Sequence, residues 1–218
     1  MSSRERILNR LRQGAEQQSV PAQRQPVNQV WAAPEESNWL DLFCQNMSDN
    51  HADVILTTEA QWMAELQRRL SGQGVSRLLC GDNAQGHALQ QYLNTNLPSL
   101  QADIYAAAVA KPELFMQVDA GFSVASGALA ETGSLVVSTG PQEPRTLSLV
   151  PPLNIVLVKQ SQLRANFSAW VAEGMMPDMM PTNLLLISGP SKTADIQQTL
   201  AYGAHGPKSL IVLMLTDA

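Results

Sequence analysis

The chain has 218 residues and a mass of 23.7 kDa, which fits one domain of ordinary to large size, with or without an arm. Apolar residues make up 44%, so a disordered or collagen-like chain is excluded. Charged residues make up only 15%, the net charge is -5 and the pI is near 5.1, which argues against electrostatic capture of nucleic acid or of an anionic lipid surface.

The N-terminal segment predicts a short amphipathic helix followed by a linker. Ile7, Leu8 and Leu11 form one apolar stripe among arginines, and residues 13–34 are rich in Gln, Pro, Ala and Ser. We therefore expect an N-terminal helical arm with a flexible linker at 1–34 and a single α/β domain at 35–218. So short a helix is marginal alone in water, so we expect it to dock on its own body or on a neighbour, which makes self-association possible. Attachment to a membrane surface is a less favoured alternative.

The sequence shows neither a targeting segment nor a cofactor motif. No secretory-type apolar stretch follows the N-terminal charges, and no 18 apolar residues run uninterrupted, so we expect a cytoplasmic protein without a membrane span. Cys44 and Cys80 lie 36 residues apart and match neither zinc nor iron-sulfur spacing. We expect two free thiols and no cofactor bound by this chain.

From residue 38 onward, amphipathic stretches alternate with apolar runs, which is typical of βαβ crossovers and a largely parallel sheet. The pattern predicts helices at 39–47, 59–70 and 84–93, and strands at 53–57, 75–80 and 103–107.

The central region departs from this alternation. Three β-rich pieces at 122–126, 133–139 and 154–159 follow one another with Gly and Pro turns between them, and we expect antiparallel strands added to the parallel sheet. Together these patterns predict an α/β fold with a mostly parallel mixed sheet and flanking helices.

The last third of the sequence again predicts βαβ crossovers. Leu163, Phe167 and Trp170 or Val171 predict a helix, and residues 183–188 predict an apolar strand of the buried parallel kind. A helix at about 192–202 and a final strand at 209–215 follow.

The first stretch that can carry chemistry is Glu131-Thr132-Gly133-Ser134. A glycine in a turn allows neighbouring N–H groups to point at an anion, the hydroxyls add donors, and Glu131 can serve as general base, nucleophile or acceptor. A β-bulge or hairpin turn with an exposed Glu is the alternative.

The second stretch is Gly189-Pro190-Ser191-Lys192-Thr193, with Asp195 after it, between the predicted strand and helix. A helix N-terminus at the carboxyl edge of a sheet favours a phosphate or carboxylate. Ordinary helix capping by Ser191 or Thr193 is equally compatible with these residues.

His205 and Gly206 belong to a Gly-flanked turn in which the imidazole can bind a ligand oxygen or move a proton, although a lone surface His is the commoner case. Arg145 can fix a carboxylate or pair with an acid of the chain. Because this half of the chain is poor in charge, we expect one cleft to gather five charged residues: Glu131, Arg145, Lys192, Asp195 and Lys208.

The order and wording of ETGSLVV, RTLSLVPP and LLISGPSKTADIQQTLAYGAHGPKSLIVLML closely resemble the lactate utilisation protein C family (LutC/YkgG, the LUD domain) over residues 118–215. The resemblance implies a NagB/RpiA/CoA-transferase-like fold. It also implies a role in L-lactate oxidation to pyruvate, with iron-sulfur clusters on partner subunits, and it assigns no catalytic residues.

Our leading hypothesis is a non-cluster component of an iron-sulfur-dependent lactate utilisation system that binds a small anionic ligand or a cofactor at loops 131–134, 189–193 and 205–207. Two alternatives stay open: a free-standing enzyme of transferase or isomerase type that uses Glu131, and a pure assembly module. The candidate residues are Glu131 for catalysis, and Thr132, Gly133, Ser134, Arg145, Gly189, Pro190, Ser191, Lys192, Thr193, Asp195, His205 and Gly206 for ligand binding.

Overall fold

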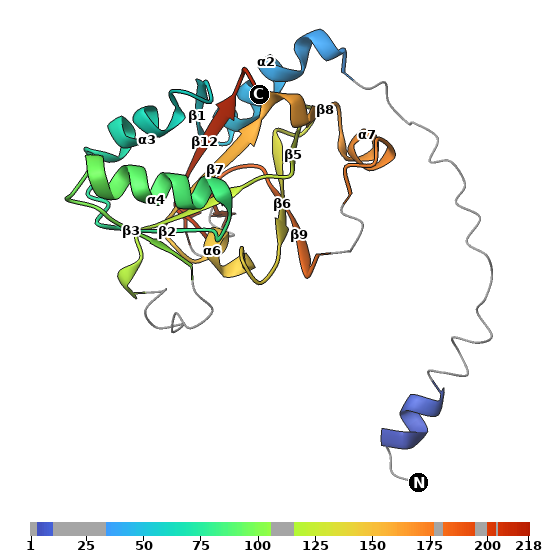
Figure 1. The fold of residues 1–218 in the computed structure, drawn as a ribbon. Coiled ribbons are helices and arrows are strands. Elements are labelled where there is room, and N and C mark those ends of the chain that lie inside the picture. Colours follow the sequence, from blue (N-terminus) through green and yellow to red (C-terminus); the bar gives the residue numbers. More distant parts are fainter. Residues whose placement is uncertain (1–3, 11–33, 106–115, 177–180, 195–199, 204) are drawn as a thin grey trace. The chain divides into compact units, whose positions relative to one another are not determined.

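The computed structural model describes residues 4–10, 34–105, 116–176, 181–194, 200–203 and 205–218 (Figure 1). The chain divides into two compact units, Met1–Ala32 and Ala33–Ala218. In the first unit, residues 4–10 form a helix with exposed side chains. Among the helices of the described ranges, none is both long enough and apolar enough to cross a bilayer.

Six parallel strands form the central sheet of the second unit, in the order β1-β12-β7-β4-β2-β3 (Figure 1). Its inner strands are apolar runs buried on both faces, as parallel sheets require, and β12 pairs with β7 from Ser209↔Leu153 to Leu215↔Lys159. The strands are β1 (Asp53–Thr57), β2 (Arg77–Cys80), β3 (Gln101–Ile104), β4 (Ala120–Val124), β7 (Leu153–Lys159) and β12 (Ser209–Leu215).

Two helices, α3 (Trp62–Leu70) and α4 (Ala84–Asn96), cover one face of this sheet (Figure 1). The apolar stripe of α3 is buried there, and Trp62 stacks on Phe122 of β4 with ring centroids 5.7 Å apart. Hydrophobic burial and aromatic stacking therefore hold this layer in place.

A smaller sheet and the helix α2 (Trp39–Asp49) lie on the opposite face. Phe43 and Met47 of α2 share a core with Val156 and Val212 of the central sheet. The smaller sheet has the order β8-β5-β6-β9, made of β5 (Gly127–Leu129), β6 (Ser134–Thr139), β8 (Leu163–Arg164) and β9 (Asn183–Ile187).

Short elements complete the unit. They are η1 (Glu36–Asn38), α6 (Arg145–Leu149), η2 (Gln160–Gln162), α7 (Phe167–Ala172) and the antiparallel pair β10 (Lys192–Ala194) and β11 (Leu200–Tyr202). The α/β class with a mostly parallel sheet and flanking helices is confirmed.

The prediction for the central β-rich pieces was partly wrong. Strands β4 and β7 are parallel members of the central sheet, not antiparallel additions to it. The piece at 133–139 becomes β6, which pairs antiparallel with β5 and β9 in the separate smaller sheet.

Three further predictions in the last third need correction. Strand β9 runs antiparallel to β6 and is only partly buried, with Leu186 51% exposed, because it lies in the smaller sheet. Leu163 belongs to β8, so the helix there starts at Phe167. Residues 192–194 and 200–202 form a two-stranded antiparallel pair in place of the predicted helix, while 195–199 lie outside the described residues.

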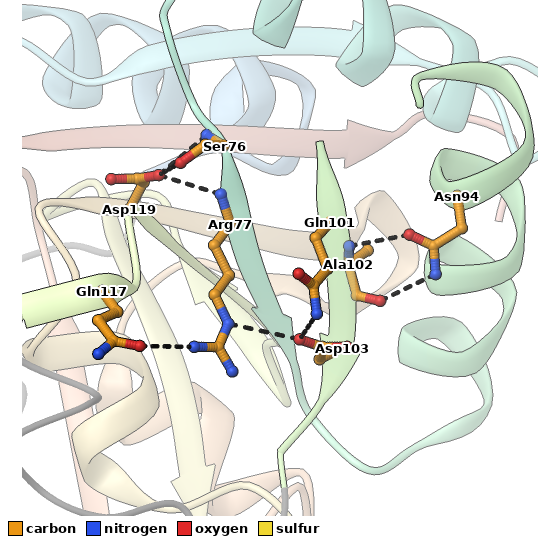
Figure 2. Close-up of polar contacts among 8 residues, drawn as sticks. All are labelled: Ser76, Arg77, Asn94, Gln101, Ala102, Asp103, Gln117 and Asp119. Carbon is orange, nitrogen blue, oxygen red and sulfur yellow. Dashed lines mark hydrogen bonds and ion pairs between the residues drawn. The ribbon is translucent and has the colours of Figure 1, made fainter. Parts of the chain in front are cut away.

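Polar side chains hold the amino ends of β2, β3 and β4 (Figure 2). Asp119, just before β4, accepts hydrogen bonds from the backbone N–H groups of Ser76 and Arg77 and from the Ser76 hydroxyl. Asn94 of α4 bonds both backbone groups of Ala102, each at 2.9 Å. Because β3 is an edge strand, this amide occupies backbone groups that would otherwise be free to pair with another strand.

Candidate functional site

The Glu131-Thr132-Gly133-Ser134 stretch forms the turn of the β5–β6 hairpin and the first residue of β6. Gly133 has φ 56°, a conformation that favours glycine, and a Cβ placed there would lie 2.5 Å from the Cβ of Asn46 in α2. The hairpin turn therefore packs directly on the last turns of α2, and Gly133 makes that approach possible.

Asn46 fixes the backbone of this turn. Its amide donates to the carbonyl oxygens of Ala130 at 3.0 Å and Glu131 at 3.1 Å, while the Glu131 N–H donates to Ala165 O at 2.9 Å. The backbone of Glu131 is thus held on both sides, and its side chain is half-buried.

The second predicted loop packs on the same end of α2. Gly189 has φ 148°, and a Cβ there would lie 2.9 Å from the Cβ and 3.0 Å from the carbonyl oxygen of Asn50. Both glycine-containing loops are therefore positioned by neighbouring turns of one helix, through Asn46 and Asn50.

A chain of hydroxyl groups links the two loops. Thr132 Oγ1 lies 2.7 Å from Ser134 Oγ, which lies 2.7 Å from Ser188 Oγ. Ser134 is buried, so these neutral hydrogen bonds satisfy a hydroxyl group that is withdrawn from water.

The turn around His205 completes the arrangement. The Ser191 N–H donates to Pro207 O at 2.8 Å, the Gly203 N–H donates to Ser191 O at 3.0 Å, and a Cβ on Gly206 would lie 3.2 Å from Ser191 Cβ. The loop that contains Ser191 and the turn at 203–207 thus lie against each other, although the helix predicted at 192–202 would separate them in the sequence.

The second loop and the turn around His205 border a half-open cavity of about 220 Å³. Five predicted residues line it: Gly189, Pro190, Ser191, His205 and Gly206. The rest of the lining is formed by Ser148, Leu149, Asn154, Leu186, Ile187, Ser188, Pro207 and Leu210.

The other predicted residues lie outside this lining. Thr132 and Ser134 are connected to it through the hydroxyl chain to Ser188, and Gly133 does not line it. Four charged residues predicted to gather at the cleft are absent from the lining: Glu131, Arg145, Lys192 and Lys208. Arg145 is exposed at the start of α6, Thr193 lies in β10, and Asp195 lies outside the described residues.

The cavity lies at the amino ends of β7 and β12, since Asn154 and Leu210 are the second residues of these strands. This differs from the predicted location at the carboxyl edge, at the N-terminus of a helix. Because residues 192–194 are a strand, a helix dipole at Ser191 does not contribute to anion binding here.

The sequence interpretation missed Asn154 and Ser148, both only 2% exposed. Asn154 left a detectable signal, because it is a polar residue inside the apolar strand LNIVLVK. An amide buried in a parallel strand needs a hydrogen-bonding explanation.

A second hollow, of about 260 Å³, lies at the carboxyl edge of the central sheet. The chain leaves β2 toward β3 and leaves β4 toward β7, so the ends of β2 and β4 form a topological switch point. Glu143 lines this hollow, and its carboxylate accepts from the Val124 N–H at 2.7 Å and from the Asn83 amide at 3.2 Å. Burial raises the pKa of Glu143 above its usual value, against the opposing effect of these two hydrogen bonds.

Within the described ranges, no three His, Cys, Asp or Glu side chains gather as ligands for a metal ion. Cys44 is half-buried in α2, and Cys80 is fully buried in β2. Burial raises the pKa of both thiols, and nearby carboxylates add to the effect.

Fold and site together define a three-layer α/β protein with a small cavity, lined by apolar side chains and a few polar ones, at the amino ends of its central strands. The LUD domain family model matches residues 40–215, and the chain belongs to the LUD domain family. The resemblance seen in the loop sequences is thereby confirmed.

Several relatives match almost end to end. The chain is 34% identical to an uncharacterized protein of Neisseria meningitidis serogroup B, covering 99% of this chain and 94% of that one. It is 25% identical to a protein of Geobacillus kaustophilus named lactate utilization protein C, covering 88% and 85% of the two chains. A protein of the same name from Exiguobacterium is 24% identical, with 100% and 97% covered.

The fold also matches a crystal structure of a DUF162 family protein from Deinococcus radiodurans. The TM-score is 0.56 at 19% identity, with 84% of this chain and 99% of that chain covered. This likeness supports the fold alone.

Proposed function

We propose that this chain is a non-cluster component of a lactate utilisation system that oxidises L-lactate to pyruvate. The observation that carries the proposal is the nearly full-length similarity to proteins named lactate utilization protein C, within a shared family. Two cysteines are too few for a four-thiolate cluster, so the iron-sulfur clusters of such a system belong to partner subunits.

In this proposal the chain binds a small anionic ligand or cofactor at loops 131–134, 189–193 and 205–207. Support comes from the convergence of Ser191 with the His205–Pro207 turn around one cavity, and from the hydroxyl chain that joins Ser134 to Ser188. Serine hydroxyls and an imidazole are suitable donors to a carboxylate.

Deletion of the gene in a strain without a second copy tests the physiological role. Growth on L-lactate should fail and should return when the wild-type gene is supplied. Unimpaired growth of the deletion strain overturns the proposal.

A biochemical experiment tests the subunit role. Affinity purification of the chain should recover partners that contain iron, and lactate-dependent dye reduction by the assembly should fall when this chain is left out. The variant Glu131→Gln separates the transferase-type alternative, because it should complement growth if Glu131 is not the base or nucleophile.

A further inference from the structure

The two edges of the central sheet are protected to different degrees. Strand β3 ends the sheet on one side and β1 ends it on the other (Figure 1). On β3, the Asn94 amide bonds both backbone groups of Ala102, and Asp103 adds a charged side chain. A covered backbone and a charge on an edge strand both discourage pairing with another strand.

Strand β1 has no protection of this kind after its first residue. Its last four residues, Val54–Thr57, contain neither a charge, a proline nor a glycine. Leu56 is 51% exposed, and among the residues that the structure describes no strand pairs with the outer side of β1. Aliphatic and β-branched residues favour pairing between strands, so β1 presents an apolar edge to which another strand can add.

The hydrogen bonds of β1 show which of its backbone groups are available. The Thr57 carbonyl accepts from the Thr216 N–H, so the backbone groups of Thr57 point toward β12. In a parallel pair, alternate residues bond the neighbouring strand and the residues between them point away from it. The N–H and C=O groups of Val54 and Leu56 therefore point outward, along the free edge of β1.

We propose that the free edge of β1 is a self-association surface, on which β1 of a second copy pairs antiparallel about a two-fold axis that passes between the two Ile55 residues. Val54 then lies opposite Leu56 of the second copy, and Leu56 lies opposite its Val54. Both are hydrogen-bonded pairs with two bonds each, so every outward group of the two residues is used. This surface differs from the N-terminal arm, and the inference is independent of the proposed function.

Side chains and charges favour this register over those centred on Val54 or Asp53. Val54 and Leu56 project on the same face, so the exposed Leu56 packs on an apolar residue of the second copy. The two Asp53 carboxylates are four positions apart, about 13 Å, which exceeds the Debye length of about 8 Å at physiological salt. Registers centred on Val54 or Asp53 would bring these two like charges closer. Each Asp53 is also neutralised within its own chain, because Arg69 Nε donates to its carboxylate at 2.6 Å.

A second edge strand of similar composition has a different setting. In β9, at the edge of the smaller sheet, Leu186 is also 51% exposed. Leu186 lines the 220 Å³ cavity, so its exposure belongs to the site described above. It gives a matched control for Leu56, because the residue type and the exposed fraction are the same and only the edge differs.

Sedimentation equilibrium of the full chain tests the inference. The wild type should approach a mass of twice 23.7 kDa as its concentration rises. Leu56→Lys places an ammonium group against the apolar Val54 of the second copy and should raise the dissociation constant of the dimer at least about tenfold, whereas Leu186→Lys should leave it unchanged. A monomer at every concentration up to about 0.5 mM, a dimer that both variants leave intact, or dissociation by Leu186→Lys overturns the inference.

Introduced cysteines test the register. The two Ile55 residues form a non-hydrogen-bonded pair with Cα atoms about 4.5 Å apart, so the Ile55→Cys chain should form a disulfide between two copies on oxidation. In the Leu56→Cys chain the two thiols lie on a diagonal, with Cα atoms about 7 to 8 Å apart, and should not bridge. The wild type on a non-reducing gel controls for the native thiols of Cys44 and Cys80. A cross-link in Leu56→Cys, or none in Ile55→Cys, overturns the inference.

Discussion

The hydroxyl oxygens of Ser134 and Ser188 lie 2.7 Å apart and join two loops that are 54 residues apart in the chain. Removing either hydroxyl should lower the free energy of unfolding by about 0.5 to 1.5 kcal/mol, the usual net value of one such bond. A double-mutant cycle of Ser134→Ala and Ser188→Ala, measured by urea denaturation, should give a coupling energy of the same order. Strictly additive effects would show that the two hydroxyls do not interact.

A second prediction concerns Gly86, in the first turn of α4. A Cβ there would lie 2.0 Å from the carbonyl oxygen of Gly81, a backbone atom that cannot move aside easily. Gly→Ala inside a helix normally stabilises, by about 1 kcal/mol. Here we expect Gly86→Ala to destabilise by about 1 to 3 kcal/mol, as in other overpacked sites.

The matched control for that substitution is Gly72→Ala. No atom lies within 4 Å of a Cβ placed on Gly72, so its effect on the free energy of unfolding should lie within about 0.5 kcal/mol of zero. Urea denaturation of both variants makes the comparison. Equal effects of the two substitutions would contradict the close packing of α4 on the end of β2.

Glu143 gives a third prediction, on the dependence of stability on pH. Burial raises its pKa in the folded protein, so the folded state holds this proton more tightly than the unfolded state. Its contribution to stability is complete below its ordinary pKa of 4.5 and is lost as the pH rises through the folded value. Relative to Glu143→Gln, the wild type should therefore lose stability as the pH rises above about 4.5. Urea denaturation of both proteins from pH 4 to 8 measures this, and a constant difference would contradict it.

The elements that sequence predicted well are those whose pattern is local. The apolar face of α2 and of α3, and the apolar runs within β1 and β12, predict the type of each element whatever that element pairs with. Pairing was harder to predict. The run in β9 reads as a buried parallel strand, but its partner is β6, and this pairing leaves Leu186 half exposed.

The predicted helix at 192–202 failed for a similar reason. Its capping residues and helical composition are local signals, whereas the observed strand pair is held by contacts with distant backbone. The Ser191 N–H bonds Pro207 O, and the Ser191 carbonyl accepts from Gly203. Tertiary hydrogen bonds of this kind override a weak helix propensity.

The candidate site also contains residues that local sequence signals identify and a residue whose role depends on long-range contacts. Gly189 and His205 could be chosen from sequence because Gly- and Pro-containing loops mark turns where backbone approaches other groups closely. No turn signal of this kind marks Asn154 as a residue of the site. Its importance comes from burial and from an unpaired oxygen, and both depend on strands β4 and β12 being its neighbours.

Asp119 supplies the last prediction, with a pH dependence opposite to that of Glu143. Burial alone would raise its pKa, but hydrogen bonds from the Ser76 hydroxyl and from the backbone N–H groups of Ser76 and Arg77 lower it overall (Figure 2). A carboxylate with a lowered folded pKa stabilises the protein above its ordinary pKa of 3.8, and this contribution is lost as the pH falls through the folded value. Asp119→Asn should therefore destabilise at pH 7, by about 1.5 to 3 kcal/mol for hydrogen bonds to a charged group, and the difference from the wild type should shrink below about pH 4. Urea denaturation at pH 3 and pH 7 provides the measurement. A difference that is equally large at both values would mean that the charge of Asp119 does not hold the amino ends of β2 and β4 together.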